Sequence, residues 1–280
     1  MYEILEKEYL NPTVCRMKID APEVSRRCDA GQFIILRASE DGERIPLTVA
    51  DYDREKGTVT IIFQLVGATT EELGHLNEGD CLADFAGPLG KKTKTEGISR
   101  VAVVGGGVGS AIAYPVAKKL HAQGANVDAI VGFRTRDLVI LEDEFRVAST
   151  ELYMMTDDGS YGEKGFVTDA LEKLILAGNK YDEVIAIGPL PMMKFVSLLT
   201  KKYGIKTVVS MNPIMIDGTG MCGCCRLTVG GETKFACVDG PEFDGHLVDF
   251  DEAIRRSAMY REFETEKREE TCNLFKKEVE

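Results

Sequence analysis

The strongest constraint on this 280-residue chain is a group of four cysteines near its C-terminal end, at positions 222, 224, 225 and 237. The surrounding segment, from residue 211 to about 250, is rich in glycine and cysteine and has little room for an apolar core. So small a unit usually needs a metal to order it. In a cytosolic chain, cysteines clustered in this way favour metal binding over disulfides.

The spacing within this segment indicates which side chains would bind the metal. Cys222 and Cys225 form a C-x-x-C pair, whose two thiolates can meet at one metal site, and Cys237 supplies a third. The intervening glycines allow the loop to wrap an iron–sulfur cluster and to direct N–H groups at its sulfides. Ferredoxin-type loops follow the pattern C-x4-C-x2-C, and Asp217 stands five positions before Cys222. The predicted ligand set is therefore Asp217, Cys222, Cys225 and Cys237.

Two alternatives stay open for this segment. Cys224 in place of Asp217 would give four thiolates, although the adjacent side chains of Cys224 and Cys225 would point apart. A structural zinc site also uses cysteines, but a zinc ribbon normally has two separated C-x-x-C pairs. The pattern favours an iron–sulfur cluster over zinc, and Asp217 over Cys224.

Two glycine-containing loops indicate a dinucleotide site. The buried run 101–104 leads into the loop 105–109, Gly-Gly-Gly-Val-Gly, and a helix is expected from there through residue 120. Glycine lets the backbone approach a pyrophosphate, and a helix N-terminus offers unpaired N–H groups. The loop lacks the full G-x-G-x-x-G spacing, so a tight turn without a ligand is the alternative. A second loop at 188–193 follows the buried strand 183–187; its alternative is a plain turn with Pro191 at the start of a helix.

The remaining patterns predict three units and a terminal helix. Residues 1–97 alternate short apolar runs with turns, which predicts an antiparallel β-barrel; strands are expected at 33–36, 47–50, 58–65 and 81–85, and a short helix with Thr69 as its N-cap. Residues 98–210 alternate strands with helices, which predicts a Rossmann-like parallel α/β domain. Residues 211–250 form the small cluster domain, and the charged residues 251–280 are expected to form a helix.

Charge and hydropathy exclude several partners. The net charge of −12 argues against nucleic acid and anionic lipid, because phosphate binding needs a basic surface. No apolar run approaches the roughly 18–20 residues that cross a bilayer, and the N-terminus lacks a signal-peptide pattern. A soluble cytoplasmic protein is expected.

Together these features resemble the FAD- and NAD-binding electron-transfer subunits of the ferredoxin–NADP reductase superfamily, over nearly the whole chain. The chain is similar to the dihydroorotate dehydrogenase electron-transfer subunit, and closer still to the small (alpha) subunits of NADH-dependent ferredoxin:NADP oxidoreductase. The most specific stretch is 217–240, which includes the run Phe-Ala-Cys-Val-Asp-Gly that begins at residue 235. The dihydroorotate relatives have a cysteine at the position of Asp217, and an aspartate there is typical of the small-subunit family.

The resemblance implies an FAD site in the barrel. The family's first FAD motif, R-x-Y-[ST], is similar to residues 44–48, where the arginine stands one place early and a leucine replaces the aromatic residue. Residues 66–70 resemble the second FAD segment, and 87–90 resemble the loop between domains. The implied contacts are Arg44, Pro46, Leu47, Thr48, Gly67, Thr69, Thr70 and Gly87.

The resemblance also implies a nicotinamide site in the α/β domain, although Ile187 stands where the family usually has a cysteine. NAD is favoured over NADP, because the acids at 142–144 would repel a 2′-phosphate near Arg134. The implied contacts are Gly105, Gly106, Gly107, Gly109, Arg134, Asp157, Asp158, Gly188, Pro189 and Met192.

The function implied by the resemblance is an oxidoreductase subunit that moves electrons between NAD(H), FAD and a [2Fe–2S] cluster. No catalytic side chain is expected, because the cofactors carry the chemistry. In the family, a larger flavin and [4Fe–4S] subunit handles NADPH and ferredoxin, and the heterodimer performs flavin-based electron bifurcation. One alternative is an electron-transfer subunit of dihydroorotate dehydrogenase or another flavoenzyme. Another is a zinc-stabilised, dinucleotide-sensing module without catalysis.

Overall fold

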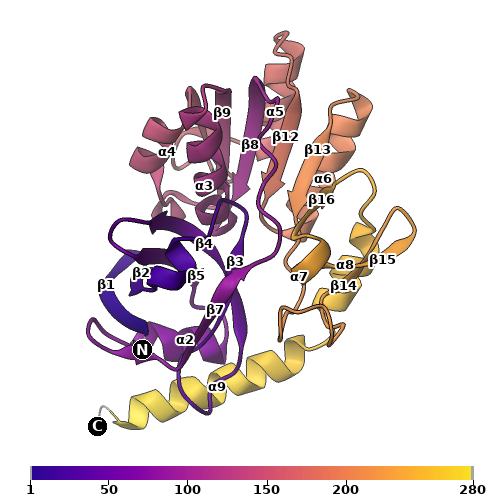
Figure 1. Ribbon diagram of the computed structural model, residues 1–280. Helices are drawn as coiled ribbons and strands as arrows, with labels where there is room; N and C mark the ends of the chain where they lie inside the picture. Colours follow the sequence, from indigo (N-terminus) through magenta and orange to yellow (C-terminus); the bar gives the residue numbers. More distant parts are fainter. Residues whose placement is uncertain (1, 279–280) are drawn as a thin grey trace.

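The computed structural model describes the backbone of residues 2–278 and the side chains of residues 2–270. Residues 1, 279 and 280 lie outside the described part, so the last two positions of the predicted C-terminal helix are not described. Two seven-stranded sheets form the body of the protein, and the N-terminal sheet lies below the C-terminal one in Figure 1. Within the described residues, no helix has the length and apolar character needed to span a membrane.

The first sheet is a nearly closed antiparallel barrel. Its elements are β1 (Tyr2–Asn11), β2 (Val14–Asp20), α1 (Pro22–Ser25), β3 (Phe33–Arg37), β4 (Ile45–Asp53), β5 (Thr58–Gln64), α2 (Ala68–His75), β6 (Cys81–Leu82) and β7 (Asp84–Leu89). The strand order is β6-β1-β2-β5-β4-β3-β7. Alternate residues of β2, namely Cys15, Met17 and Ile19, are fully buried, as expected where one face of each strand points into the barrel.

The second sheet is parallel except at one edge. Its elements are β8 (Arg100–Gly106), α3 (Gly109–Ala122), β9 (Asn126–Phe133), the 3-10 helix Arg136–Leu138, α4 (Glu142–Ala148), β10 (Glu151–Thr156), β11 (Glu163–Lys164), α5 (Val167–Leu176), β12 (Glu183–Ile187), α6 (Leu190–Lys202), β13 (Thr207–Ser210) and β16 (Glu242–Asp244). The strand order is β11-β10-β9-β8-β12-β13-β16. Strands that follow β8 in the chain are added first on one side of it, from β9 to β11, and then on the other side, from β12 onward. Every residue of β12 is buried, which is typical of a parallel strand covered on both faces by helices.

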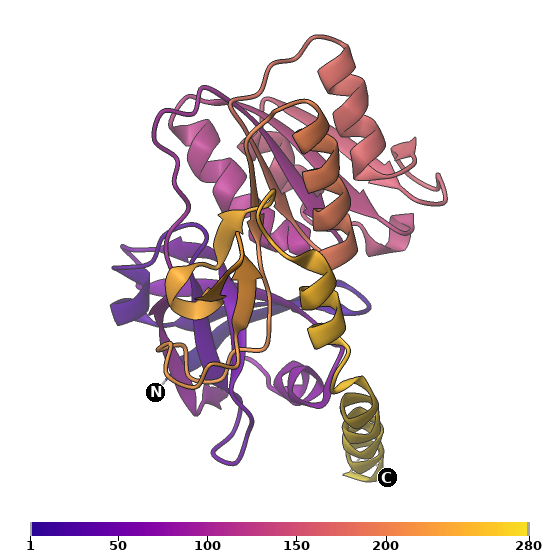
Figure 2. The same ribbon diagram turned by 90° about the vertical axis from the view of Figure 1, so that its right-hand side faces the viewer.

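The C-terminal segment returns to the α/β sheet before it crosses to the barrel. It contains β14 (Arg226–Val229), β15 (Glu232–Phe235), α7 (Ala236–Asp239), β16, α8 (Phe250–Ser257) and α9 (Arg261–Glu278). β16 falls in the range expected to form the cluster domain, yet it pairs antiparallel with β13 of the α/β sheet. Helix α9 runs along the barrel beside α2 (Figures 1 and 2), where Arg268 Nη2 lies 2.8 Å from Glu71 Oε1.

The expected fold class is confirmed, with three local corrections. The single helix expected over 251–280 is two helices, α8 and α9, because the chain turns at residues 258–260. The helix expected to start with Thr69 as N-cap has Gly67 as its N-cap instead. The reason is that the Thr70 hydroxyl accepts the Gly67 N–H at 3.0 Å, whereas the Thr69 hydroxyl donates to Glu43 at 3.1 Å. The single strand expected at 81–85 is two strands, β6 and β7, which lie at opposite ends of the barrel's strand order.

Three apolar clusters hold these elements together. One fills the barrel, and one lies on the α3 and α4 side of the α/β sheet. The third lies on the α5 and α6 side and reaches beyond the sheet into both neighbouring units. We call this third cluster the shared apolar layer, because it contains Phe33 of the barrel, Met211 and Met215 of the connecting segment, and Cys225 and Cys237 of the C-terminal unit.

A half-buried carboxyl group lies where β16 meets the segment that connects the barrel to the α/β sheet. The Thr93 hydroxyl donates to Glu242 Oε1 at 2.5 Å. Burial raises the pKa of Glu242 to about 7; the Thr93 hydrogen bond opposes this rise, nearby Glu183 adds to it, and Lys119 opposes it. The charged form of Glu242 is therefore disfavoured in the folded protein.

This raised pKa predicts a pH-dependent contribution to stability. Between pH 4.5, the ordinary value, and about 7, folded Glu242 keeps its proton while the unfolded chain loses it. The free energy of unfolding should therefore fall as the pH rises through this window. The glutamine of Glu242→Gln is neutral at every pH. At pH 8 the free energy of unfolding of this variant should therefore exceed that of the parent by on the order of 1–2 kcal/mol, and its Tm should be higher. Calorimetry from pH 5 to pH 8 measures this difference.

Glu151→Gln is the control, because Glu151 is an exposed residue at the start of β10. It should keep the pH profile of the parent. If Glu242→Gln also kept that profile, Glu242 would not hold its proton in the folded state.

Candidate functional site

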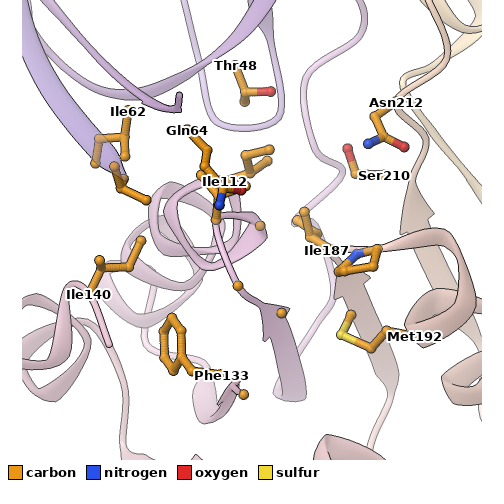
Figure 3. A pocket seen from close by; sticks show the side chains of 18 of the residues that line it. Thr48, Ile62, Gln64, Ile112, Phe133, Ile140, Ile187, Met192, Ser210 and Asn212 are labelled. Carbon is orange, nitrogen blue, oxygen red and sulfur yellow. The ribbon is translucent and has the colours of Figure 1, made fainter. Parts of the chain in front are cut away.

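A cavity of about 1120 Å³ lies between the barrel and the carboxyl ends of the parallel strands. It is large compared with the roughly 300–1,000 Å³ of ordinary ligand pockets. It lies at the point where the strand order reverses between β8 and β12, which is where open α/β sheets bind their ligands. Figure 3 shows side chains from both sheets around it, with Thr48 and Ile62 from the barrel and Ile187 and Met192 from the α/β side.

The two glycine loops form the α/β wall of this cavity and lie against each other. A Cβ atom on Gly109 would lie 2.6 Å from Gly188 Cα and 2.6 Å from the Ile187 carbonyl oxygen. A Cβ atom on Gly106 would lie 2.4 Å from Met192 Sδ. The loop turns at Gly107, whose φ is +54°, and α3 begins at Gly109. The N-terminus of a fourteen-residue helix thus faces the cavity, an arrangement suited to a pyrophosphate.

The barrel wall comes from β4, β5 and the start of α2. Pro46, Leu47 and Thr48 of β4 line the cavity, as does Thr70 at the first turn of α2. Gln64, at the end of β5, adds an amide to this wall. This wall is mostly apolar with a few polar groups, the composition of a cofactor site. It suits the flat, partly apolar ring of a flavin.

The cavity brings together most of the residues predicted to bind a cofactor. Those that line it are Pro46, Leu47, Thr48, Thr70, Gly106, Gly107, Gly109, Arg134, Asp157, Gly188, Pro189 and Met192. Six others lie outside its lining: Arg44, Gly67, Thr69, Gly87, Gly105 and Asp158. Arg44 is exposed, and the Asp158 carboxylate accepts the Ser160 N–H and hydroxyl, at 2.9 and 2.6 Å, within its own turn.

Several residues that line the cavity were not predicted from the sequence. They are Phe33 and Gln64 from the barrel, Phe166 before α5, and Ser210, Asn212 and Met215 after β13. The polar pair at 210 and 212 follows a short apolar run at the carboxyl end of a strand. This is the same signal that identified the other two loops, but it falls at the boundary where the α/β domain was expected to end.

The predicted metal ligands form a partly assembled site. Cys225 and Cys237 are buried, and their sulfur atoms lie 3.2 Å apart. Burial and the neighbouring Cys225 thiol raise the pKa of Cys237 to about 12. Cys222 is exposed on the glycine-rich loop that connects Asp217 to Cys225. Among the described residues, no group of three or more His, Cys, Asp or Glu side chains converges as a metal site.

Asp217 and Cys224 are the two candidates for the fourth ligand. The Asp217 carboxylate accepts the Thr219 N–H at 2.8 Å and the Cys222 N–H at 3.0 Å. These bonds hold the pKa of Asp217 below its usual value, with the Thr219 bond the larger effect. A hydrogen bond with Cys222 raises the pKa of the half-buried Cys224 thiol. Two adjoining buried thiols and a third on a glycine-rich loop fit an iron–sulfur cluster, and the choice of fourth ligand stays a prediction.

Comparisons with known proteins agree with this description. Residues 212–249 match the family model of the iron-sulfur cluster binding domain of dihydroorotate dehydrogenase B. The chain is 49% identical over 262 residues to a Thermotoga maritima homologue of the dihydroorotate dehydrogenase B (NAD(+)) electron transfer subunit, covering 94% of this chain and 92% of that protein. It is 55% identical over 269 residues to an uncharacterized Clostridium beijerinckii protein, covering 93% and 91%.

A solved structure gives a similar result for the whole fold. It concerns flavin-based electron bifurcation by the NADH-dependent reduced ferredoxin-NADP oxidoreductase, and one of its chains is 46% identical to this one. The TM-score is 0.92, and the match covers 96% of this chain and 97% of that chain. The likeness therefore includes the barrel, the α/β sheet and the C-terminal unit.

The contact between the two glycine loops predicts the effect of a small substitution. Gly109→Ala should lower the free energy of unfolding by about 1–3 kcal/mol, because the added methyl group meets backbone atoms that cannot move aside. Scanning calorimetry would record this as a Tm lower by several degrees. Gly67→Ala is the matched control, since a Cβ there meets no atom within 4 Å and should cost at most about 1 kcal/mol. Equal Tm losses in the two variants would contradict the close contact.

Proposed function

The chain belongs to the family of dihydroorotate dehydrogenase B electron-transfer subunits, and on this premise we propose that it passes electrons between NAD(H), FAD and a [2Fe–2S] cluster. It is an oxidoreductase subunit with an iron–sulfur binding domain and a flavin-binding reductase fold, and such subunits work with a larger catalytic partner. The finer proposal is that it is the small subunit of an electron-bifurcating NADH-dependent ferredoxin:NADP oxidoreductase. In that complex the larger subunit would bind NADPH and ferredoxin.

The observation that carries this proposal is the continuity between the cavity and the cysteine pair. Phe33, Met211 and Met215 line the cavity and belong to the same buried cluster as Cys225 and Cys237. A flavin in the cavity and an iron–sulfur cluster at the cysteines would therefore be connected through packed apolar side chains. Such packing would hold the two groups at a fixed separation, which favours electron transfer between them.

The residues of the chain have distinct roles in this proposal. The backbone of residues 106–109 and the N-terminus of α3 would hold the dinucleotide pyrophosphate. Residues 46–48 and Thr70 would hold the flavin against the barrel. When bound, the flavin supplies the exchange between paired electrons from the nicotinamide and single electrons for the cluster. The protein contributes binding, orientation and the exclusion of water.

The proposed preference for NAD over NADP depends on Asp157 and not on the acids at 142–144. Glu142 pairs with Arg146 and Tyr161, and Glu144 pairs with Arg16, so these acids are occupied and lie outside the cavity lining. Asp157 lines the cavity directly after β10, and Arg134 directly follows β9, the strand paired with β10. A carboxylate there disfavours a 2′-phosphate and can accept a hydrogen bond from a ribose hydroxyl.

For the cluster, we propose Asp217, Cys222, Cys225 and Cys237 as ligands. Asp217→Cys should keep a [2Fe–2S] cluster but shift its reduction potential, because a thiolate donates softer electron density than a carboxylate. A redox titration followed by electron paramagnetic resonance measures the shift. Cys224→Ser is the control and should leave both the iron content and the potential unchanged. If Cys224→Ser lost the cluster and Asp217→Cys kept the potential of the parent, Cys224 and not Asp217 would be the fourth ligand.

A second function is favoured by the family model and by several relatives, which are electron-transfer subunits of dihydroorotate dehydrogenase B. Activity assays of the purified complex distinguish the bifurcating function from the dihydroorotate dehydrogenase function. For a bifurcating enzyme, ferredoxin reduction should require NADPH and NAD+ together, and omission of either should abolish it. Orotate formation from dihydroorotate would instead support the second function. A colourless protein that holds zinc and lacks flavin would contradict both.

A further inference from the structure

Two polar side chains face the cavity from the segment that follows β13. Ser210 ends that strand, Asn212 lies two residues on, and both line the cavity. In Figure 3 the two side chains lie on the same side of the cavity as Ile187 and Met192, across from Ile62 and Gln64. Within the described part of the chain, neither of these side chains has a hydrogen-bond partner. We propose that Asn212, assisted by Ser210, binds the carboxamide of the nicotinamide ring and thereby positions the ring. This proposal rests on the proposed function.

Chemical complementarity favours the carboxamide as the ligand group. A nicotinamide ring is apolar except for its carboxamide, which carries one acceptor oxygen and an NH₂ donor. An asparagine amide carries the same two groups, so the two amides can exchange a pair of hydrogen bonds. A hydroxyl such as that of Ser210 can donate or accept a further bond.

Three amide side chains line the described cavity, and two of them are poorly suited to this role. Asn11 is already occupied, because its Nδ2 donates to the Leu138 carbonyl at 3.2 Å and its Oδ1 accepts the Thr13 N–H at 2.9 Å. Gln64 belongs to β5 of the barrel, on the wall suited to a flavin. Asn212 is the amide on the α/β side, where the two glycine loops are suited to a dinucleotide.

The backbone directly before Asn212 is held on both sides. β13 pairs with β12 on one side, through Ala186 and Val209. On the other side Ser210 is in register with Glu242 of β16. The Met211 N–H donates to the Pro241 carbonyl at 2.9 Å. The segment is therefore part of the sheet framework, as a positioning residue requires.

Apolar side chains on the same side of the cavity suit the ring itself. Ile187 and Met192 line the same side of the cavity and offer an apolar surface for the face of a nicotinamide ring. Ile187 ends β12, the strand next to β13, so the apolar surface and the amide come from adjacent strand ends. A ring placed there would face the barrel wall, where the flavin is proposed to bind.

The experiment compares two ligands that differ only at the carboxamide. Isothermal titration calorimetry of the purified, flavin-loaded complex would measure the Kd of NAD+ and of 3-acetylpyridine adenine dinucleotide, in which a methyl ketone replaces the amide and removes its donor. The parent should prefer NAD+. Asn212→Ala should weaken NAD+ binding roughly tenfold and the analogue by less than about threefold, so the preference should shrink. Ser210→Ala should have a smaller effect in the same direction.

The controls separate recognition from folding and from flavin binding. Asn212→Leu keeps the size of the side chain without its polar atoms and should behave as Asn212→Ala does. Asn179→Ala removes an amide from the loop after α5, outside the cavity lining, and should leave both Kd values unchanged. FAD content, from the absorbance spectrum, should equal that of the parent in every variant.

The outcomes distinguish this proposal from the proposed function. If the parent binds NAD+ but Asn212→Ala keeps its preference over the analogue, the role of Asn212 is overturned and the proposed function stands. If the variant loses FAD with the preference intact, Asn212 holds the flavin and the proposal is wrong. If the parent binds no NAD+, the proposed function and the role of Asn212 both fail.

Discussion

The arrangement of this protein depends on the shared apolar layer that joins its three units. Phe33 comes from the barrel, Met211 and Met215 from the connecting segment, and Cys225 and Cys237 from the C-terminal unit. Apolar burial is non-directional and grows with the area removed from water, so one cluster can stabilise three units at once. Because the C-terminal unit is too small for a core of its own, it depends on this layer for much of its packing. The cavity wall and the cysteine pair are consequently fixed by the same contacts.

Much of the fold could be predicted because its strands carry strong patterns. The strand 183–187 was predicted with the bounds that β12 has, since a fully buried parallel strand is a continuous apolar run. β1 was not predicted. Ile4 is its one fully buried apolar residue, and charged side chains fill much of its exposed face. A sequence shows burial through apolar residues, and a strand that buries few of them gives little signal.

The candidate site could be predicted at positions where a close backbone contact or the chemistry of a ligand permits few residue types. Gly109 must lack a side chain because a Cβ there would meet the backbone of Gly188, and a Cβ on Gly188 would meet Met192 and the Gly106 backbone. The sequence shows such a requirement directly. The cysteines at 222, 225 and 237 were predicted to be ligands for a similar reason, because iron–sulfur clusters are held mainly by cysteine thiolates. Ser210 and Asn212 were missed because serine and asparagine are common in ordinary loops. Their importance follows from the position of β13, which only the sheet order reveals.

The antiparallel edge formed by β13 and β16 connects these observations. The chain leaves the sheet at Ser210, forms the cysteine loop, and returns at Glu242, three residues after Asp239 ends α7. The Met211 N–H bonds to the Pro241 carbonyl at 2.9 Å, so the start and the end of this excursion are held together. The cysteine loop is therefore tied at its base to the residues that line the cavity. A carboxamide site at Asn212 and an iron–sulfur cluster at Cys237 would then share one framework, and the separation between the two redox sites would be set by the sheet and not by the loops.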